Sequence, residues 1–131
     1  MLKDSVMKLV ENFTQDIWNG ANFDVANTLF ADNFIDHDPI LGQGLGGTGF
    51  VKMVQMLRAT TPNLLVTNDA VYIDPIQNVV TIRWRAKGKS RGSIFDFLFG
   101  EKFFEHKGID IFRIENDKFV EHWGEIDLFP L

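Results

Sequence analysis

The sequence predicts an α+β domain in which three helices precede a curved, mostly antiparallel sheet. Two observations carry this prediction. Apolar residues recur at helical spacing in three segments before Pro62, and the spacing changes to alternation after it. Helices followed by a run of strands, without regular alternation of the two, are typical of the α+β class. At 131 residues the chain suits one domain, so we expect a single domain over residues 1–131.

The first two helices are predicted from apolar stripes near the amino terminus. The first stripe extends from Val6 to Ile17, and Asn19-Gly20 after it predicts a left-handed stop. A shorter helix is expected over residues 24–30. A short extended segment is expected at residues 34–37, because a proline and several glycines follow it.

The third helix is predicted between a glycine-rich loop and Pro62. Its apolar face extends from Phe50 to Leu57, and Thr48 is the expected N-cap. The loop at residues 42–47 satisfies the glycine pattern of dinucleotide-binding proteins. Because no strand and helix units alternate around it, we interpret it as a flexible loop at the rim of a pocket rather than as a nucleotide site.

Four strands are predicted after Pro62 from alternating apolar and polar residues. They are expected at residues 64–73, 79–87, 103–114 and 119–126. The turn signals between them include Asp74-Pro75 and Asn116-Asp117. Strands joined by short turns predict an antiparallel meander, and we expect it to curl so that one face covers the helices.

Composition excludes several classes of function. A formal net charge of −5 argues against nucleic-acid binding, which needs a concentrated basic surface. No apolar run approaches the roughly 20 residues that cross a bilayer, so no membrane association is expected. The absence of cysteine excludes disulfides, thiol nucleophiles and cysteine metal sites. Charged residues near the amino terminus are unlike a secretory signal, and a cytoplasmic location is therefore expected.

The last predicted hairpin assigns residues to the two faces of the sheet. With residues 116–117 as a two-residue loop, counting outward places Asp110 opposite Trp123. The same count puts Phe112 on the face of Asp110. It puts His122 on the opposite face.

Asp110 is the first candidate catalytic residue. It has isoleucines on both sides in the sequence and an aromatic residue across the predicted ladder. Desolvation in such surroundings would raise the pKa of Asp110 and make it a proton donor or acceptor near neutral pH. The alternative, in which Asp110 faces solvent or pairs with a cation, stays open.

His37 and Asp38 are the second candidate pair. Pro39 restricts the backbone before it, and a loop begins there. Acids and imidazoles on loops at the rim of a rigid scaffold are typical of catalytic groups, although the same residues also form plain turns.

Phenylalanine is unusually frequent, with 13 residues against one tyrosine. Such an excess fits either a tightly filled core or the walls of a pocket for an apolar ligand. The candidates for ligand-binding walls are Trp18, Phe34, Trp84, Phe112 and Trp123. The spacing of the three histidines matches no ligand motif, so no metal site is expected.

Two segments carry a resemblance to known families. Residues 30–39 look like the segment of ketosteroid isomerase-like proteins that places an acid just before a proline. Residues 108–114, followed by 121–123 and Asp127, resemble the ending of the SnoaL-like polyketide cyclases. Both groups belong to the nuclear transport factor 2-like superfamily. The resemblance implies a conical fold, in which three helices pack on a strongly curved sheet that encloses a pocket.

The resemblance also implies roles for individual residues. Asp110 matches the cavity acid, which stabilises a developing enolate in the isomerases and transfers protons during ring closure in the cyclases. Asp38 matches the general base of the isomerases, and His37 matches a histidine often found in the SnoaL-like group. A homodimer is a further implication, and no metal or organic cofactor is implied.

The expected function is therefore that of a cofactor-independent acid–base enzyme, of cyclase or isomerase type, with a small apolar carbonyl compound as its partner. Neutral Asp110 would hydrogen-bond the carbonyl while Asp38 or His37 removes a proton from the adjacent carbon. Two alternatives stay open. They are a non-catalytic protein that binds an apolar ligand and an interaction scaffold of the same fold.

Overall fold

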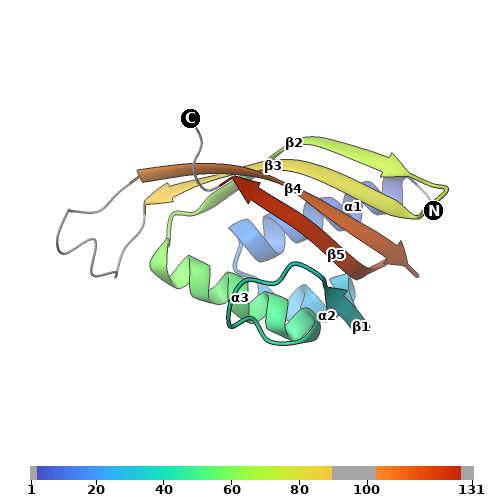
Figure 1. Ribbon diagram of the computed structural model, residues 1–131, viewed down its shortest axis with the longest axis horizontal. Coiled ribbons are helices and arrows are strands. Elements are labelled where there is room, and N and C mark those ends of the chain that lie inside the picture. Colours follow the sequence, from blue (N-terminus) through green and yellow to red (C-terminus); the bar gives the residue numbers. More distant parts are fainter. Residues whose placement is uncertain (1–2, 90–102, 128–131) are drawn as a thin grey trace.

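The computed structural model describes residues 3–89 and 103–127. A curved sheet of five strands arches over the helices, which lie against its concave face (Figure 1). The strand order is β1-β5-β4-β3-β2, in which β1 pairs parallel to β5 and the other pairs are antiparallel. The predicted α+β class and antiparallel meander are confirmed.

The strands lie close to their predicted positions, with one exception. The sheet contains β1 (Phe30–Asp36), β2 (Leu65–Asp74), β3 (Val79–Lys89), β4 (Phe103–Glu115) and β5 (Lys118–Asp127). The exception is β1, which was expected over residues 34–37 and begins at Phe30. Phe30 and Phe34 are both buried, so the strand starts where the first of these rings enters the core.

The helical layer differs from the predictions at the end of the first helical segment and at the start of α3. It contains α1 (Lys3–Asn12), the π-helix η1 (Phe13–Asn19), the 3-10 turn η2 (Phe23–Val25), α2 (Ala26–Leu29) and α3 (Gly46–Thr60). The expected left-handed stop at Gly20 is wrong, because Gly20 has a φ of −96° and the left-handed residue is Ala21, with a φ of 51°. Glycine is needed at position 20 for space, since a Cβ there would lie 2.6 Å from the carbonyl oxygen of Gln15.

The predicted N-cap of α3 is also wrong. Thr48 lies inside the helix, and Leu45 occupies the cap position. The helix begins earlier than predicted because the glycine-rich loop packs directly on its first turn. A Cβ at Gly49 would lie 1.9 Å from the carbonyl oxygen of Gly44, so only glycine permits this contact.

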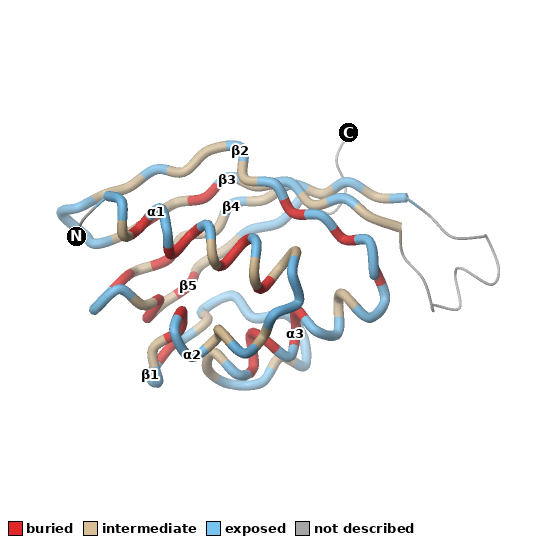
Figure 2. Tube along the Cα trace, turned by 180° about the vertical axis from the view of Figure 1, so that it is seen from behind, coloured by how far each residue is buried: buried red, intermediate tan, exposed pale blue. Residues whose placement is uncertain are grey.

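The core lies between the concave face of the sheet and the helices. Buried residues face one another across this interface (Figure 2). Six phenylalanine rings form its centre, with neighbouring centroids between 4.1 and 6.2 Å apart; they are Phe13, Phe30, Phe34, Phe50, Phe112 and Phe119. Within residues 3–89 and 103–127, no helix is long and apolar enough to cross a membrane.

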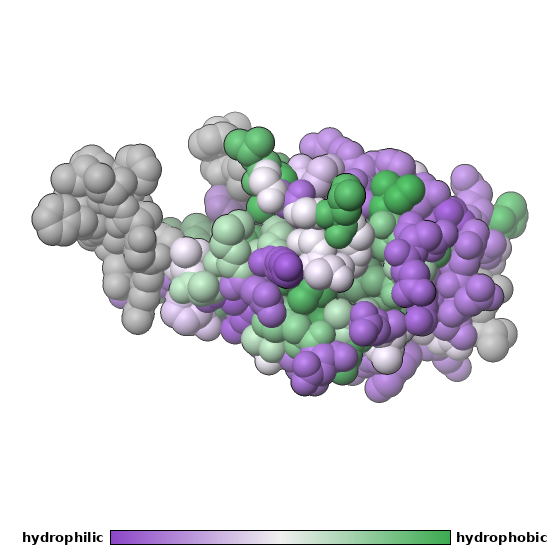
Figure 3. Space-filling model, turned by 90° about the horizontal axis from the view of Figure 1, so that it is seen from below, coloured by the Kyte–Doolittle hydropathy of each residue, from purple (hydrophilic) through white to green (hydrophobic). Residues whose placement is uncertain are grey.

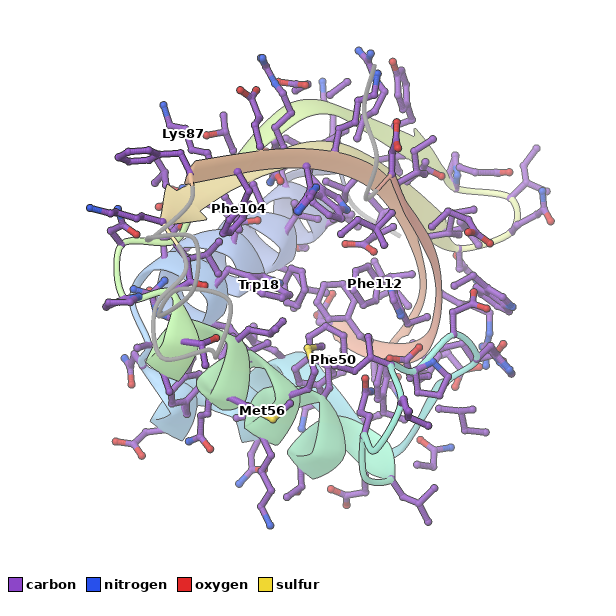
Figure 4. The ribbon with its side chains drawn as sticks, turned by 60° about the vertical axis from the view of Figure 1, so that its left-hand side comes forward. Trp18, Phe50, Met56, Lys87, Phe104 and Phe112 are labelled. Carbon is purple, nitrogen blue, oxygen red and sulfur yellow. The ribbon has the colours of Figure 1, made fainter. Side chains whose placement is uncertain are left out.

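The core fills only one end of the concave face. On β4, Ile114 and Phe112 are buried, whereas the next residues on the same face are half-buried: Asp110, Gly108, His106 and Phe104. The same change occurs on β3, from buried Val80 and Ile82 to half-buried Trp84, Ala86 and Gly88. We call the half-buried stretch, Trp84 to Gly88 and Phe104 to Asp110, the open end. Figure 4 shows Trp18, Phe50, Phe104 and Phe112 pointing into the space between sheet and helices, whereas Lys87 points away from it.

Candidate functional site

The hairpin between β4 and β5 positions the candidate site. Asn116 and Asp117 have φ values of 52° and 59°, as a tight two-residue turn requires. The first pairs beyond the turn are those that the sequence predicts. The register then shifts, because Arg113 pairs with Glu121 and leaves Val120 as an extra residue. Val120 therefore forms a β-bulge.

The bulge reverses the predicted faces of β5. Asp110 pairs with Gly124 rather than with Trp123, and Phe112 pairs with His122. The predictions that Trp123 lies across from Asp110 and that His122 occupies the opposite face are therefore wrong. His122 lies on the concave face beside Asp110.

Three side chains from different strands meet at this point. The Nε2 of His122 lies 2.8 Å from Oδ1 of Asp110, and its Nδ1 lies 2.8 Å from Oδ1 of Asp36. Asp36 is the last residue of β1 and pairs with His122 in the parallel register of β1 and β5. The exposed fractions of the side chains are 6% for Asp36, 8% for His122 and 18% for Asp110. We call these three residues the acid–histidine–acid chain.

The two carboxylates hold His122 in its protonated form. Burial of the ring disfavours the charge, but the hydrogen bonds to Asp110 and Asp36, together with the charges of both carboxylates, outweigh burial and raise the pKa of His122 from 6.5 to about 9. Both ring nitrogens therefore carry a hydrogen at neutral pH, and each donates it to one acid.

Asp36 is held in its ionised form by several donors. Burial opposes ionisation, but hydrogen bonds from His122, Gln43 and the backbone N–H of Asp38 outweigh burial and lower the pKa of Asp36. The Nε2 of Gln43 lies 2.8 Å from Oδ2 of Asp36. The loop before α3 thus holds Asp36 from one side while His122 holds it from the other.

The family model for SnoaL-like polyketide cyclases matches residues 8–131. The chain belongs to the SnoaL-like polyketide cyclase family. No curated protein matches the chain at a significant level of similarity.

Solved structures of other proteins share the fold of this SnoaL-like protein. TsrD from Streptomyces laurentii is 23% identical, with a TM-score of 0.82, over 98% of this chain and 92% of that one. A putative polyketide cyclase from Bacillus cereus ATCC 10987 is 21% identical, with a TM-score of 0.78, over 94% and 74%. AclR, a putative hydroxylase from Streptomyces galilaeus, is 14% identical, with a TM-score of 0.76, over 98% and 83%. The expected conical fold is confirmed.

In this SnoaL-like protein, His37 lies on the convex side of the sheet. Its ring stacks on Trp123, with centroids 4.9 Å apart and an interplanar angle of 13°. Its Nε2 lies 3.1 Å from Oε2 of Glu121, which also pairs with Arg113. His37 and Trp123 therefore form part of the outer surface, away from Asp110.

Asp38 is exposed at the edge of β5. Its Oδ2 accepts a hydrogen bond of 2.9 Å from the backbone N–H of Gly124. The sequence predicts that Asp38 and Asp110 act together. In the structure both acids lie beside Gly124, but among the described residues no hydrogen bond joins them. The acid that converges with Asp110 is Asp36, two residues earlier.

The remaining wall candidates fall into two groups. Phe34 and Phe112 are 3% and 0% exposed and belong to the packed core. Trp18 and Trp84 are half-buried and pack against that core at the open end. Trp123 lies on the convex face, so of the five candidates only these two tryptophans are half-buried on the side of the sheet that faces the helices.

An open depression lies beside Asp36, where β1 faces the loop before α3. It measures about 700 Å³ and is lined by β1, by α2 and by the loop and first turns of α3, including Asp36 and Gln43. Seen from the helix side, apolar surface occupies the middle of the molecule and polar surface covers one end (Figure 3).

The sequence reasoning missed Asp36 and His122. Their roles depend on the Val120 bulge and on the parallel pairing of β1 with β5, which join residues 86 positions apart. One signal was present. Phe119 and Val120 are consecutive apolar residues within the predicted strand, and such a break in alternation is typical of a bulge.

Proposed function

We propose that this SnoaL-like protein is a cofactor-independent acid–base enzyme of cyclase or isomerase type, which forms an enolate from a small apolar carbonyl compound at Asp110. One observation carries the proposal. The acid–histidine–acid chain ends at Asp110, where the packed core gives way to the open end. Partly buried charges are costly, and such groups are typical of functional sites.

The acid–histidine–acid chain prepares Asp110 to act as a base. Protonated His122 donates its Nε2–H to Oδ1 of Asp110. Within the described ranges, no hydrogen bond occupies the other oxygen, Oδ2. One oxygen is thus fixed while the other is available to a substrate. His122 and Asp36 are positioning residues in this scheme.

The proposed reaction conserves every proton. Asp110 removes a proton from the carbon next to a carbonyl, and the electrons of that C–H bond pass to the carbonyl oxygen to give an enolate. The enolate carbon then attacks a second carbonyl of the same molecule, and Asp110 returns the proton to the new alkoxide. In the isomerase variant, Asp110 returns the proton to a different carbon.

Proton exchange into a simple ketone tests the proposal. In D₂O, the wild-type protein should accelerate deuterium incorporation at C2 of 1-tetralone above the buffer rate, as followed by NMR. Asp110→Asn should lose roughly a hundredfold or more of that acceleration. Asp38→Asn is the matched control and should retain it. A wild-type rate equal to that of Asp110→Asn would refute the proposal, and binding of the ketone without exchange would favour the non-catalytic ligand-binding alternative.

The proposal includes a cytoplasmic homodimer that associates through the convex face of the sheet. Large apolar side chains on that face support it, since Leu65, Tyr72 and Ile109 are 44%, 56% and 44% exposed. Light scattering should give twice the mass of the chain, and Ile109→Lys should shift the protein toward the monomer.

A further inference from the structure

Among residues 3–89 and 103–127, two buried ring nitrogens at the open end have no hydrogen-bond partner. They are Nε1 of Trp84 and Nδ1 of His106, and both atoms are buried. Neither finds a partner in the part of the chain that the structure describes. Buried polar groups in native proteins are nearly always paired, because an unpaired group loses its bonds to water without replacement. A pair of such atoms on one surface therefore needs an explanation.

The two rings are neighbours on the concave face. Trp84 pairs with Gly108 in the register of β3 and β4, and His106 pairs with Ala86. The two residues are thus diagonal neighbours on one face, a spacing at which large side chains reach one another. Their free nitrogens belong to one local region of the open end.

Packing fixes both rings in place. The indole of Trp84 lies over Gly108, where a Cβ would come within 2.4 Å of its Cζ2. The ring of His106 stacks on Phe104, with centroids 5.0 Å apart and an interplanar angle of 19°. Because these contacts hold the planes of both rings against their neighbours, the nitrogens are preorganised for a partner from outside the chain.

The chemistry of the two nitrogens defines that partner. An indole N–H only donates, so the partner must offer an acceptor atom, and His106 Nδ1 suits an oxygen that accepts or donates. The cations of these two strands share the parity of the convex face, and four of the six are exposed there: Arg83, Arg85, Lys87 and Lys107. A neutral carbonyl or hydroxyl oxygen therefore fits better than a carboxylate or phosphate.

We propose that Trp84 and His106 form a polar subsite that binds a neutral carbonyl or hydroxyl oxygen of the substrate, at the end remote from the reacting carbon. This rests on the proposed function, in which Asp110 marks the reacting end. Gly108, opposite Trp84, is two residues from Asp110 along β4, and His106 is four residues away. At about 3.4 Å per residue, the bound oxygen lies about 7 to 14 Å along the strand from the acid.

A matched pair of probes tests the subsite. The compounds are 6-hydroxy-1-tetralone and 6-methyl-1-tetralone, which differ only in the group remote from the carbonyl. The wild-type protein should bind the hydroxyl compound more tightly, and the ratio of the two dissociation constants should fall roughly fivefold in Trp84→Phe, which keeps an aromatic ring without the N–H. His106→Phe should reduce the ratio similarly, whereas Trp123→Phe on the convex face should not.

A second measurement needs no substitution at position 84, so it can be made even if Trp84→Phe does not fold. The chain has three tryptophans, so its indole N–H signals can be assigned by elimination from Trp18→Phe and Trp123→Phe. The hydroxyl probe should move the Trp84 signal downfield, and the methyl probe should not. An equal response to both probes, or no binding of either, would overturn the subsite.

The outcomes separate this inference from the proposed function. Asp110→Asn should keep the preference for the hydroxyl probe, because binding of the remote oxygen does not need the base. If the preference holds without deuterium exchange, the subsite stands and the enzyme proposal fails. If exchange depends on Asp110 while the preference is absent, the enzyme proposal stands and the subsite fails.

Discussion

His122 donates a hydrogen bond of 2.8 Å from Nε2 to Oδ1 of Asp110, and these two residues lie on different strands of the same hairpin. The bond exists because Val120 is an extra residue in β5, which turns His122 onto the concave face. Asp36 completes the arrangement by accepting the second N–H of the ring. In the proposed reaction, the hairpin thus supplies the base, Asp110, together with the cation that orients it, His122.

Removal of the His122 cation should destabilise the fold. In His122→Gln, two partly buried carboxylates lose their shared cationic partner, and we expect the free energy of unfolding at pH 6.5 to fall by about 3 kcal/mol. Urea denaturation measures this change. His37→Gln, at an exposed pair, should cost less than about 1 kcal/mol. Equal costs for the two substitutions would contradict a structural role for His122.

The contribution of His122 should depend on pH in a defined direction. Its pKa is about 9 in the folded protein against 6.5 for the free side chain, so its stabilisation is complete below pH 6.5 and is lost as the pH rises through about 9. The pKa of Asp36 is lowered from 3.8, so its stabilisation is complete above pH 3.8 and is lost as the pH falls through its lower folded value. The difference in unfolding free energy between wild type and His122→Gln should therefore be largest between pH 3.8 and 6.5 and should shrink toward pH 9. A difference that grows with pH would contradict this account.

A methyl group at Gly124 should disturb the acid–histidine–acid chain directly. Its Cβ would lie 2.8 Å from Oδ1 of Asp110 and 3.0 Å from Nε2 of His122. Gly124→Ala should cost roughly 1–3 kcal/mol of stability and slow ketone exchange at least about tenfold. Gly44→Ala is the control, since its Cβ would meet only an ordinary contact at 3.6 Å. Normal exchange in Gly124→Ala would show that the bond between Asp110 and His122 does not matter for the reaction.

Substitutions at Asp36 and Asp38 should have different effects on ketone exchange and on the pKa of His122, although the two residues are close in the sequence. Asp36→Asn removes one of the two carboxylates that hold His122, so both the exchange rate and the pKa of His122 should fall. Asp38→Asn removes the charge of a side chain that only accepts a hydrogen bond from the backbone of Gly124, and its amide oxygen can still accept that bond, so both quantities should stay near their wild-type values. NMR of the imidazole signals together with the exchange assay makes the comparison. The reverse pattern would favour Asp38 as the base.

The fold could be predicted well from the sequence because its signals are local. Helical spacing before Pro62 and alternation after it reflect which side chains face the core, and Asn116-Asp117 has the turn chemistry that a two-residue hairpin needs. Asp110 could also be singled out, since an acid between isoleucines is unusual on any strand.

The partners of Asp110 could not be predicted in the same way. Phe119 and Val120 are both apolar and both buried, so alternation alone does not show that Val120 is extra. That single residue changes the face of every later residue of β5, His122 among them. Asp36 reaches the site through the pairing of β1 with β5, which leaves no local pattern in the sequence.

The titration of His122 by NMR shows whether a protonated imidazole bridges Asp110 and Asp36. The three histidines can be assigned in NMR spectra by single substitutions. The account predicts that His122 titrates with a pKa of about 9 and that this value falls in both Asp110→Asn and Asp36→Asn. A wild-type pKa near 6.5, unchanged in the two variants, would contradict it.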